Sequence, residues 1–342
     1  MRTQLHSTMD SIPPISIIII CLNEEENLER CLRSLQQLEW PRDKMEVVVV
    51  DGGSKDRTIE VAEHFGAMIV RSPKADIPLQ RNLGIQNASN EVIAFLDADC
   101  TVSADWLSQA ARYFREHDRV VVGALRALPD DASWVARAWD VHWRSKLLHL
   151  ERNEHGVVRE QAFRQVTTQN LLTTASTADL VGGFDERLKT GEDSAFCYKA
   201  HQLGVPVVWD PRLEHVHHSE PRSLAEFFRQ QVWHSGHVGL LKLLQQAWHK
   251  PGGLNVPVFA FGTIAWCCAV LGTIAYAALT GNAIPLLAVT GVGCATYLAL
   301  AARTCIRMRR WVWIPAVAFT YFVYGVARGV GLLGLGMRYR WR

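Results

Sequence analysis

The first 125 residues alternate between short apolar runs and stretches with helical periodicity. Short continuous apolar runs are typical of strands that are covered on both faces. Strands that alternate with helices predict an α/β fold with a doubly wound, mainly parallel, Rossmann-like sheet. The predicted strands lie at 15–22, 46–50, 67–70, 92–96 and 120–125.

Helical spacing follows the first predicted strand. Leu28, Leu32 and Leu35 recur at intervals of three or four residues, and Pro41 ends the pattern. Asn23 precedes this pattern as a candidate cap, and Glu26 stands where a capping box places its carboxylate. We therefore expect a helix that begins with a capping box at Asn23.

Residues 126–250 continue with mixed structure. Residues 126–165 predict an amphipathic helical insertion that includes Trp134, Trp139, Trp143 and Arg144. This insertion is either an acceptor-binding or membrane-surface element or an ordinary packed helix. Strands are predicted near 169–174 and 205–209, and helices at 193–203 and 224–248. Pro251-Gly252-Gly253 then suggests a boundary, so residues 1–14 form a tail and 15–250 a first domain.

The hydropathy changes after residue 250. Residues 256–279, 284–302 and 311–327 are 24, 19 and 17 residues long without a charge. Since a membrane span needs about 20 apolar residues, the first two predict transmembrane helices. The third segment, extended to 311–336, either spans the bilayer or lies in its interface. The chain thus ends in a membrane region over 251–342.

The charge distribution supports a membrane location. Residues 251–342 contain eight Arg and no Lys, Asp or Glu, whereas residues 1–250 carry 28 basic and 34 acidic residues. These Arg interrupt apolar runs instead of forming a solvated basic face, which argues against nucleic acid as a partner. Four of them lie in 303–310, and the positive-inside rule places this segment in the cytoplasm. We expect a multi-pass protein of the inner (cytoplasmic) membrane with residues 1–250 on the cytoplasmic side.

The start of the chain and its cysteines agree with that location. Residues 1–16 are polar and lack the apolar stretch of a signal peptide. The eight Cys are scattered without a CxxC pair, which is typical of reduced thiols and not of a disulfide framework or a zinc site.

Carboxylates follow the predicted strands, at the edge where open α/β sheets bind ligands. Asp97 and Asp99 stand one residue apart after a buried strand, so they point to the same side and would repel each other without a cation. Mg²⁺ or Mn²⁺ fits such hard oxygen ligands. A surface turn is the alternative for this tripeptide taken alone.

Four further motifs offer polar groups. Asp51-Gly52-Gly53 would form a ligand-binding turn, although helix capping explains it as well. Arg81 is a candidate diphosphate ligand or a solvated helical residue. Glu192-Asp193 opens a helix, where acidic residues are favourable in any protein. His215 and His217 share one face of an extended segment, and one of them could bind the metal or be merely hydrogen-bonded.

In this order and spacing, the motifs resemble those of the family 2 glycosyltransferases, which have the GT-A fold. The resemblance covers residues 15–240 approximately, and the membrane tail resembles that of members that act on lipid-linked or cell-envelope glycans. The matching stretches are 16–28, 47–58, 81–84, 94–100, 181–188 and 191–199.

The resemblance implies a role for each matching residue. Asp51 would lie in the nucleotide pocket with Asn23 and Glu25 nearby, Arg81 would hold the diphosphate, and Asp97 would contact the ribose or donor sugar. The metal, Mn²⁺ or Mg²⁺, would be held by Asp99 and by His217, with His215 as the fallback. The remaining roles are a general base at Asp193 and an acceptor side lined by Phe184 and Glu192.

The resemblance also implies the reaction. The donor would be a nucleotide sugar, with uridine as the family expectation, although Gly52 stands where many relatives have a second Asp. Asp193 would deprotonate an acceptor hydroxyl, which displaces the nucleoside diphosphate with inversion. Processive synthases carry a QxxRW motif, and the corresponding helix here lacks the Arg before Trp233. We therefore expect transfer of one sugar to a lipid-linked or exopolysaccharide acceptor.

Two other functions remain open. A polyprenyl-phosphate glycosyltransferase would keep the same core but place the acceptor at the bilayer edge, and assays with polyprenyl phosphate against a lipid-linked oligosaccharide separate the two. A catalytically silent scaffold subunit would show no turnover on any nucleotide sugar. The presence of Asp97, Asp99 and Asp193 argues against the scaffold.

Overall fold

The computed structural model describes residues 13–333 apart from 149, 151, 154, 160, 161, 189 and 237–255. The described residues form two compact units. The first contains 13–129 and 150–219, and the second contains 130–148, 220–236 and 256–333. The predicted domain boundary at 250/251 lies outside the described residues and stays a prediction.

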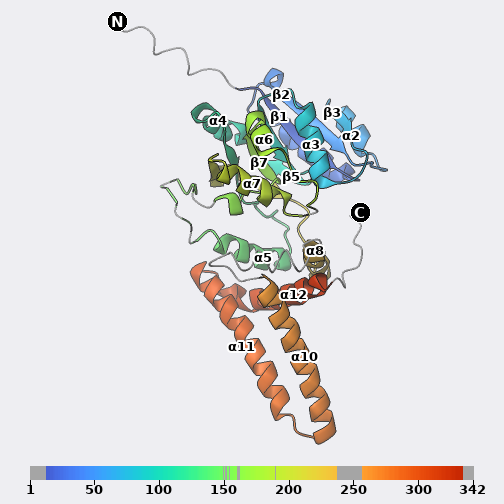
Figure 1. The fold of residues 1–342 in the computed structure, drawn as a ribbon, viewed down its shortest axis with the longest axis vertical. Coiled ribbons are helices and arrows are strands. Elements are labelled where there is room, and N and C mark those ends of the chain that lie inside the picture. Colours follow the sequence, from blue (N-terminus) through green and yellow to red (C-terminus); the bar gives the residue numbers. More distant parts are fainter. Residues whose placement is uncertain are drawn as a thin grey trace. The chain divides into compact units, whose positions relative to one another are not determined.

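The first unit is built on a seven-stranded sheet in the order β3-β2-β1-β4-β7-β6-β8 (Figure 1). Strand β7 is antiparallel to both of its neighbours, and the other neighbouring strands are parallel. This mainly parallel sheet confirms the predicted α/β fold class. The strands are β1 Ile15–Cys21, β2 Met45–Asp51, β3 Met68–Arg71, β4 Val92–Leu96, β6 Val121–Gly123, β7 Asn170–Thr174 and β8 Val207–Trp209.

Helices cover both faces of the sheet because alternate side chains of its buried strands point in opposite directions. Ile17 and Ile19 of β1 pack with buried residues of α1 and α4, whereas Ile18 faces α3. The helices of this unit are α1 Glu25–Leu35, α2 Thr58–His64, α3 Ile77–Asn87, α4 Trp106–Glu116, α6 Ala175–Val181 and α7 Glu192–Gln202, with short 3₁₀ turns at η1 Arg42–Lys44, η2 Ala162–Arg164 and η3 Pro211–Leu213.

Helix α3 approaches β1 unusually closely at Gly84. A Cβ atom at this position would lie 2.3 Å from Cγ2 of Ile18, inside van der Waals contact. The glycine therefore lets the helix that carries Arg81 lie against the central strand. The sequence pattern does not predict α3, because the buried residues of this helix include the polar Gln80 and Arg81 and have no apolar period.

The capping box predicted at Asn23 is wrong. Helix α1 begins after Glu24, with no side-chain cap. Asn23 instead has a φ of 55°, a left-handed conformation that Asn tolerates better than most residues. Its side-chain oxygen accepts a hydrogen bond from the backbone N–H of Lys55 at 2.8 Å. Asn23 thus joins two loops and does not cap a helix.

A two-stranded sheet that the sequence did not predict lies beside the large one. Strand β5 Cys100–Val102 pairs antiparallel with β9 His215–His217, and Cys100 is opposite His217 in the register. Segments far apart in the sequence are brought together by this pairing.

The second unit contains α5 Trp134–Ser145, α8 Leu224–Gly236, α10 Val256–Thr280, α11 Ile284–Arg307, η4 Trp311–Trp313 and α12 Ile314–Leu332. Three stretches are long and apolar enough to cross a membrane, namely Val258–Thr280, Ile284–Arg307 and Trp311–Leu332. This finding confirms the predicted C-terminal region of helices that are candidates to span a membrane. Two predictions need correction. The insertion at 126–165 is helical mainly at α5. The second apolar helix, predicted at 284–302, is longer, because α11 continues to Arg307 and includes the first part of the arginine-rich segment 303–310.

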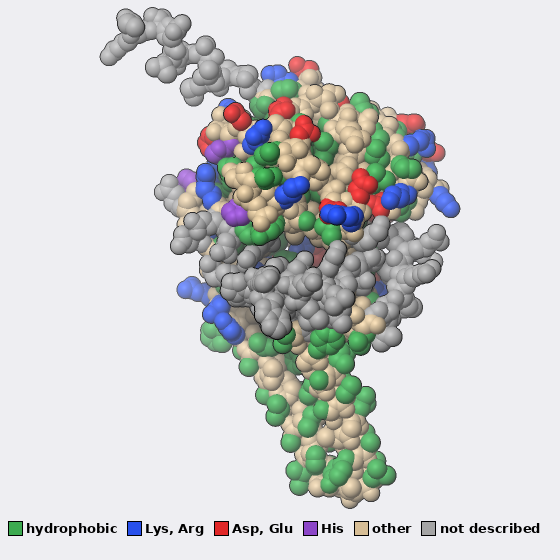
Figure 2. Space-filling view, viewed as in Figure 1, with side chains coloured by type: hydrophobic (Ala, Val, Ile, Leu, Met, Phe, Trp, Pro, Cys, Tyr) green, Lys and Arg blue, Asp and Glu red, His purple; other side chains and the backbone are tan. Residues whose placement is uncertain are grey.

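The three apolar helices differ in what covers them. Helices α10 and α11 form a hairpin, and α12 lies across one of its ends (Figure 1). Only 11% and 17% of the apolar windows of the first two helices are buried, against 44% for the third, which packs on α5, α8, α10 and α11. Figure 2 shows hydrophobic and uncharged side chains over the hairpin, as expected for a lipid-facing surface.

Candidate functional site

The carboxyl ends of the parallel strands β1, β2 and β4 meet at one edge of the sheet. Asn23 follows β1, Asp51 ends β2, and Asp97 follows β4. Because these strands are neighbours in the order β2-β1-β4, the polar groups predicted from separate motifs lie along the same edge.

Reciprocal hydrogen bonds tie the two loops that follow β1 and β2. The backbone N–H of Asn23 donates to Oγ of Ser54 at 2.8 Å, and the backbone N–H of Glu25 donates to Asp56 at 3.2 Å. A carboxylate oxygen of Glu25 accepts in return from the backbone N–H of Arg57 at 3.3 Å. The loops border a polar cleft of about 350 Å³ lined by Asn23, Glu24, Glu25, Glu26, Asn27 and Asp56.

Asp51 is buried and shapes the loop after β2. Its carboxylate accepts hydrogen bonds from the backbone N–H groups of Gly53 at 3.0 Å and Ser54 at 3.1 Å. Gly53 has a φ of 98°, which a residue with a side chain rarely adopts. Gln80 of α3 donates to the carbonyls of Val50 and Cys21 and so holds the ends of β2 and β1 together. The turn is therefore rigid where a ligand would contact it.

Arg81 is the centre of a buried ionic cluster. Its guanidinium lies 3.3 Å from Oδ1 of Asp97 and donates a short hydrogen bond to Glu192. The guanidinium also lies over the ring of Phe184, at 5.7 Å from its centroid. Burial raises the pKa of Asp97 above its ordinary value, against the opposing charge of Arg81. The cluster joins α3, the end of β4 and the start of α7.

Asp193 lies next to this cluster at the start of α7. The helix begins after Gly191, whose φ of 76° lets the chain turn sharply into it. Burial and then the negative charge of Glu192 raise the pKa of Asp193 to about 6. A carboxylate with a raised pKa is a stronger base than an ordinary one, and it still loses its proton at neutral pH.

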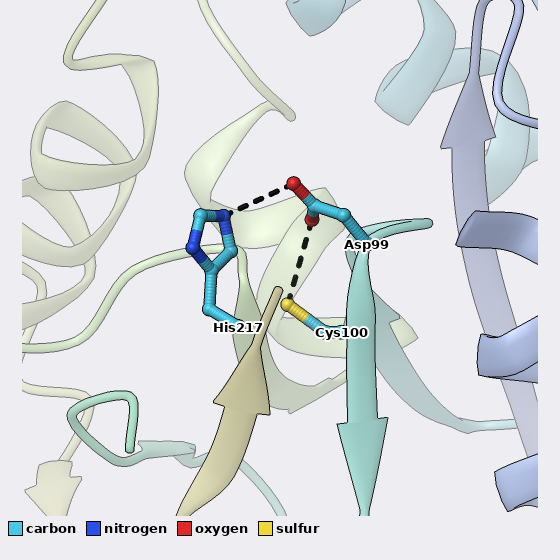
Figure 3. A group of neighbouring side chains, drawn as sticks. All are labelled: Asp99, Cys100 and His217. Atoms are coloured by element: carbon cyan, nitrogen blue, oxygen red, sulfur yellow. Dashed lines mark hydrogen bonds and ion pairs between the residues drawn. The ribbon is translucent and has the colours of Figure 1, made fainter. Parts of the chain in front are cut away.

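Asp99, Cys100 and His217 form a compact group of possible metal ligands (Figure 3). Nε2 of His217 lies 3.1 Å from Oδ2 of Asp99, and Sγ of Cys100 lies 3.7 Å from Oδ1 of the same carboxylate. Burial acts to raise the pKa of Asp99, but the charge and hydrogen bond of His217 outweigh it and lower this pKa. An ionised carboxylate oxygen and an imidazole nitrogen suit Mn²⁺, and the oxygen suits Mg²⁺.

His215 occupies a different place on the same strand. It is opposite Val102, whereas His217 is opposite Cys100, next to Asp99. The compact ligand group contains His217 and does not contain His215. The choice of His217 as metal ligand is consistent with this register and stays a prediction.

Phe184 is almost completely buried. Its ring stacks on Phe196 and meets Phe95 edge-to-face, and Asn82 makes hydrogen bonds to both its backbone N–H and its carbonyl. These contacts place Phe184 beneath the guanidinium of Arg81 as a support. Its predicted place on the acceptor side, like that of Glu192, stays a prediction.

Sequence reasoning missed three residues of this region. Cys100 follows the acidic pair, but its position fits no known spacing of metal ligands. Asn82 lies within the Arg81 motif, and Glu24 is one of three successive glutamates, so neither residue stands out in the sequence. Burial, followed by the charges of Asp99 and Asp97, raises the pKa of Glu24 to about 7, although the hydrogen bond with Asn27 lowers it. No local pattern marks them, because their positions depend on the strands and helices that surround them.

The comparison with known protein families identifies this arrangement. Residues 16–157 match the family described as glycosyl transferase family 2. This segment is therefore a glycosyl transferase family 2 domain. The matched segment contains Asn23, Asp51, Arg81, Asp97 and Asp99.

Relatives with glycosyltransferase or glycan synthase names align with this chain beyond the matched segment. Glycosyltransferase AglE of Haloferax volcanii is 25% identical over 292 residues, which are 75% of this chain and 93% of that protein. The poly-beta-1,6-N-acetyl-D-glucosamine synthase of Staphylococcus epidermidis is 25% identical over 293 residues, which are 81% of this chain and 68% of that protein. The chain is therefore similar along most of its length to named glycosyltransferases.

A solved structure shares the fold. The mannosyltransferase PcManGT of Pyrobaculum calidifontis, solved with GDP-Man and Mn²⁺, superposes with a TM-score of 0.58 at 19% identity. The superposition covers 90% of this chain and 87% of that one. It supports the GT-A fold predicted for the family 2 glycosyltransferase.

Proposed function

We propose that this family 2 glycosyltransferase transfers one sugar, with inversion, from a nucleotide-sugar donor to a lipid-linked or cell-envelope glycan acceptor. Transfer takes place at the cytoplasmic face of the inner membrane and requires Mn²⁺ or Mg²⁺. The observation that carries the proposal is the arrangement at one sheet edge, where Arg81 pairs with Asp97 and Glu192 beside Asp193.

The residues around Asp99 fit a divalent cation. Asp99 is ionised, half-buried and next to the imidazole of His217, so one hard oxygen and one nitrogen donor are available in one place. PcManGT, which shares the fold, was solved with Mn²⁺. When bound, the ion would neutralise charge on the departing nucleoside diphosphate.

The donor side is assigned to the loops that follow β1, β2 and β4. Asn23, Glu25 and Asp51 would surround the base and ribose, in the polar cleft and the rigid turn described above. Asp97 would contact the ribose or donor sugar. Arg81 would give up part of its contact with the carboxylates and bind the diphosphate instead. The planar guanidinium, with its forked donors, suits the diphosphate oxygens.

The acceptor side is assigned to the start of α7. Asp193 would remove the proton from the attacking hydroxyl, and its pKa of about 6 leaves it ionised but basic at neutral pH. Glu192 is fixed by Arg81 and holds its negative charge beside Asp193. A donor such as a UDP-sugar is expected from the family, and GDP-Man in PcManGT makes guanine a second base to test.

The membrane region would anchor the enzyme beside its acceptor. Helices α10 and α11 would span the bilayer, and α12 would lie in the cytoplasmic interface, because it crosses the end of the hairpin and is much more buried. The arginines at 303–310 favour the cytoplasm for this end. The similarity to the staphylococcal poly-beta-1,6-N-acetyl-D-glucosamine synthase supports a glycan as the acceptor class.

The test is release of nucleoside diphosphate by the full chain in detergent. A panel of UDP-, GDP- and TDP-sugars is assayed with Mn²⁺, with Mg²⁺ and with chelator, with and without polyprenyl phosphate or a lipid-linked oligosaccharide. Metal-dependent release from one donor that is lost in Asp193→Asn supports the proposal and names the sugar. The mass of the product distinguishes one added sugar from a polymer. A folded protein with no release under any condition contradicts the proposal and favours a scaffold.

A further inference from the structure

Two helix faces of the second unit meet in an aromatic and polar contact. On α5, Trp139 and His142 lie one turn apart, and on α12 Tyr321 and Tyr324 do the same. The rings of Trp139 and Tyr324 are 4.9 Å apart, and Nδ1 of His142 lies 3.0 Å from the hydroxyl of Tyr321. The contact fixes the two helices against each other.

Two cationic side chains lie on or directly after these helices. Arg328 of α12 lies over the ring of Tyr324 at 5.1 Å, and its Nη1 donates to Oγ of Ser235 on α8 at 3.2 Å. Lys146 follows α5, with its Nζ 3.9 Å from the ring centroid of Trp143. Within the described part of the chain, Nε of Arg328 is buried and has no hydrogen-bond partner.

No carboxylate balances these two charges among the described residues. The sequence has no Asp or Glu from 227 to 342, so α12, α10 and α11 supply none. Asp140 of α5 is engaged by Arg144 at 2.8 Å. Burial and then the positive charge of Arg328 lower the pKa of Lys146 to about 8. Partly buried like charges without a counterion are unfavourable, so the arrangement suits an anion.

The position in the fold indicates which anion is available. Helices α5, α8 and α12 gather at the end of the hairpin where α10 begins and α11 ends (Figure 1). The exposed arginines at 303, 307, 309 and 310 belong to the same end of α11, which places it at the level of cytoplasmic head groups. Phosphate groups of lipids are the anions concentrated at that depth.

We propose that Lys146 and Arg328, assisted by the hydroxyl of Ser235, bind the phosphate group of a membrane lipid. Two lipids share this chemistry: a polyprenyl phosphate or diphosphate that carries the acceptor, and an anionic phospholipid of the bilayer. The acceptor form rests on the function proposed above, whereas phospholipid binding is independent of it. Arg328 supplies a forked donor and Lys146 a point charge, a pair that suits the several oxygens of a phosphate.

Native mass spectrometry of the full chain in detergent measures this binding. The protein is titrated with polyprenyl phosphate, with the uncharged polyprenol and with phosphatidylglycerol. The double variant Lys146→Gln/Arg328→Gln should bind phosphate-bearing lipid at least about tenfold more weakly. Arg307→Gln, which removes an exposed arginine at the same end of the hairpin, should bind like the wild type. Arg328→Lys should retain most of the affinity because it keeps the charge.

The outcomes separate the lipids and the proposals. Preference for polyprenyl phosphate over phosphatidylglycerol identifies an acceptor site, and equal affinity identifies a head-group site. Equal binding of polyprenol, or unchanged binding by a double variant that unfolds at the wild-type temperature, overturns the proposal. If the double variant does not fold, Lys146→Gln alone carries the test, with a smaller loss expected. Donor turnover is measured in parallel, so lipid binding without turnover contradicts only the proposed function.

Discussion

Nε2 of His217, on strand β9, lies 3.1 Å from Oδ2 of Asp99, which directly precedes the neighbouring strand β5. We predict that His217→Gln lowers the affinity for Mn²⁺ by at least about tenfold, since the loss of even an outer-shell partner of a metal ligand costs about 10–100-fold in affinity. His215→Gln is the matched control on the same strand and should change the affinity much less. Electron paramagnetic resonance of Mn²⁺ titrations measures both. A larger loss in His215→Gln would transfer the role of ligand to that residue.

Cys100 should make the site sensitive to thiophilic ions. Its sulfur belongs to the same compact group as Asp99 and His217, and soft thiolates favour ions such as Cd²⁺ over Mn²⁺. We expect Cys100→Ser to weaken Cd²⁺ binding by about tenfold or more and to leave Mn²⁺ binding nearly unchanged. Cys31→Ser, another buried thiol of this region, is the control. Calorimetric titrations with Cd²⁺ and with Mn²⁺ measure both affinities. If the thiol only packed against its neighbours, Cys100→Ser would change the two affinities equally.

The activity should depend on pH through Asp193. Burial and then Glu192 raise the pKa of this carboxyl from 3.8 to about 6, and only its ionised form can accept a proton. The rate under limiting donor and acceptor should therefore rise with pH around a midpoint near 6. Glu192→Gln removes a negative charge beside Asp193, so the midpoint should move to lower pH. A midpoint that stays in place in this variant would assign the profile to another group.

The buried cluster of Arg81 should show non-additive stability effects. Arg81→Gln leaves Asp97 and Glu192 without their counterion, and breaking a buried ion pair costs about 3–5 kcal/mol. The double variant Arg81→Gln/Glu192→Gln should be less destabilised than Arg81→Gln, because fewer uncompensated charges stay buried. Denaturant unfolding measured by tryptophan fluorescence tests this order. Additive losses would mean that the cluster has little internal coupling.

The close approach of α3 to β1 predicts that Gly84→Ala is destabilising. The added methyl would lie 2.3 Å from Cγ2 of Ile18, and overpacking costs about 1–3 kcal/mol, more than the better helix propensity of Ala restores. Gln86→Ala, at an exposed position of the same helix, should be neutral or slightly stabilising. Thermal unfolding in detergent compares the two. An unchanged melting temperature for Gly84→Ala would show that α3 can move away from the strand.

The element pattern, the acidic motifs and the membrane region could be predicted from the sequence. The buried strands are nearly continuous apolar runs, and this pattern predicts β4 at 92–96. The uncharged stretches after residue 255 are long enough to be recognised as candidate membrane spans from their length alone. Polar groups at strand ends follow directly from the parallel order, because the carboxyl ends of such strands share one edge. These signals are local, so they can be read from a short segment without knowledge of the rest of the chain.

The tertiary structure decided what the local signals left open. Helix α3 has a buried Arg81 and a glycine where periodicity demands apolar residues, because it packs closely on β1 and carries a charge to Asp97 and Glu192. The pairing of β5 with β9 is a contact between distant segments, and it alone distinguishes His217 from His215 beside Asp99. Asn23 looked like a cap in the sequence, but the neighbouring loop supplied a better partner for its side chain. Contacts across long sequence separations have no period, so only the folded chain could show them.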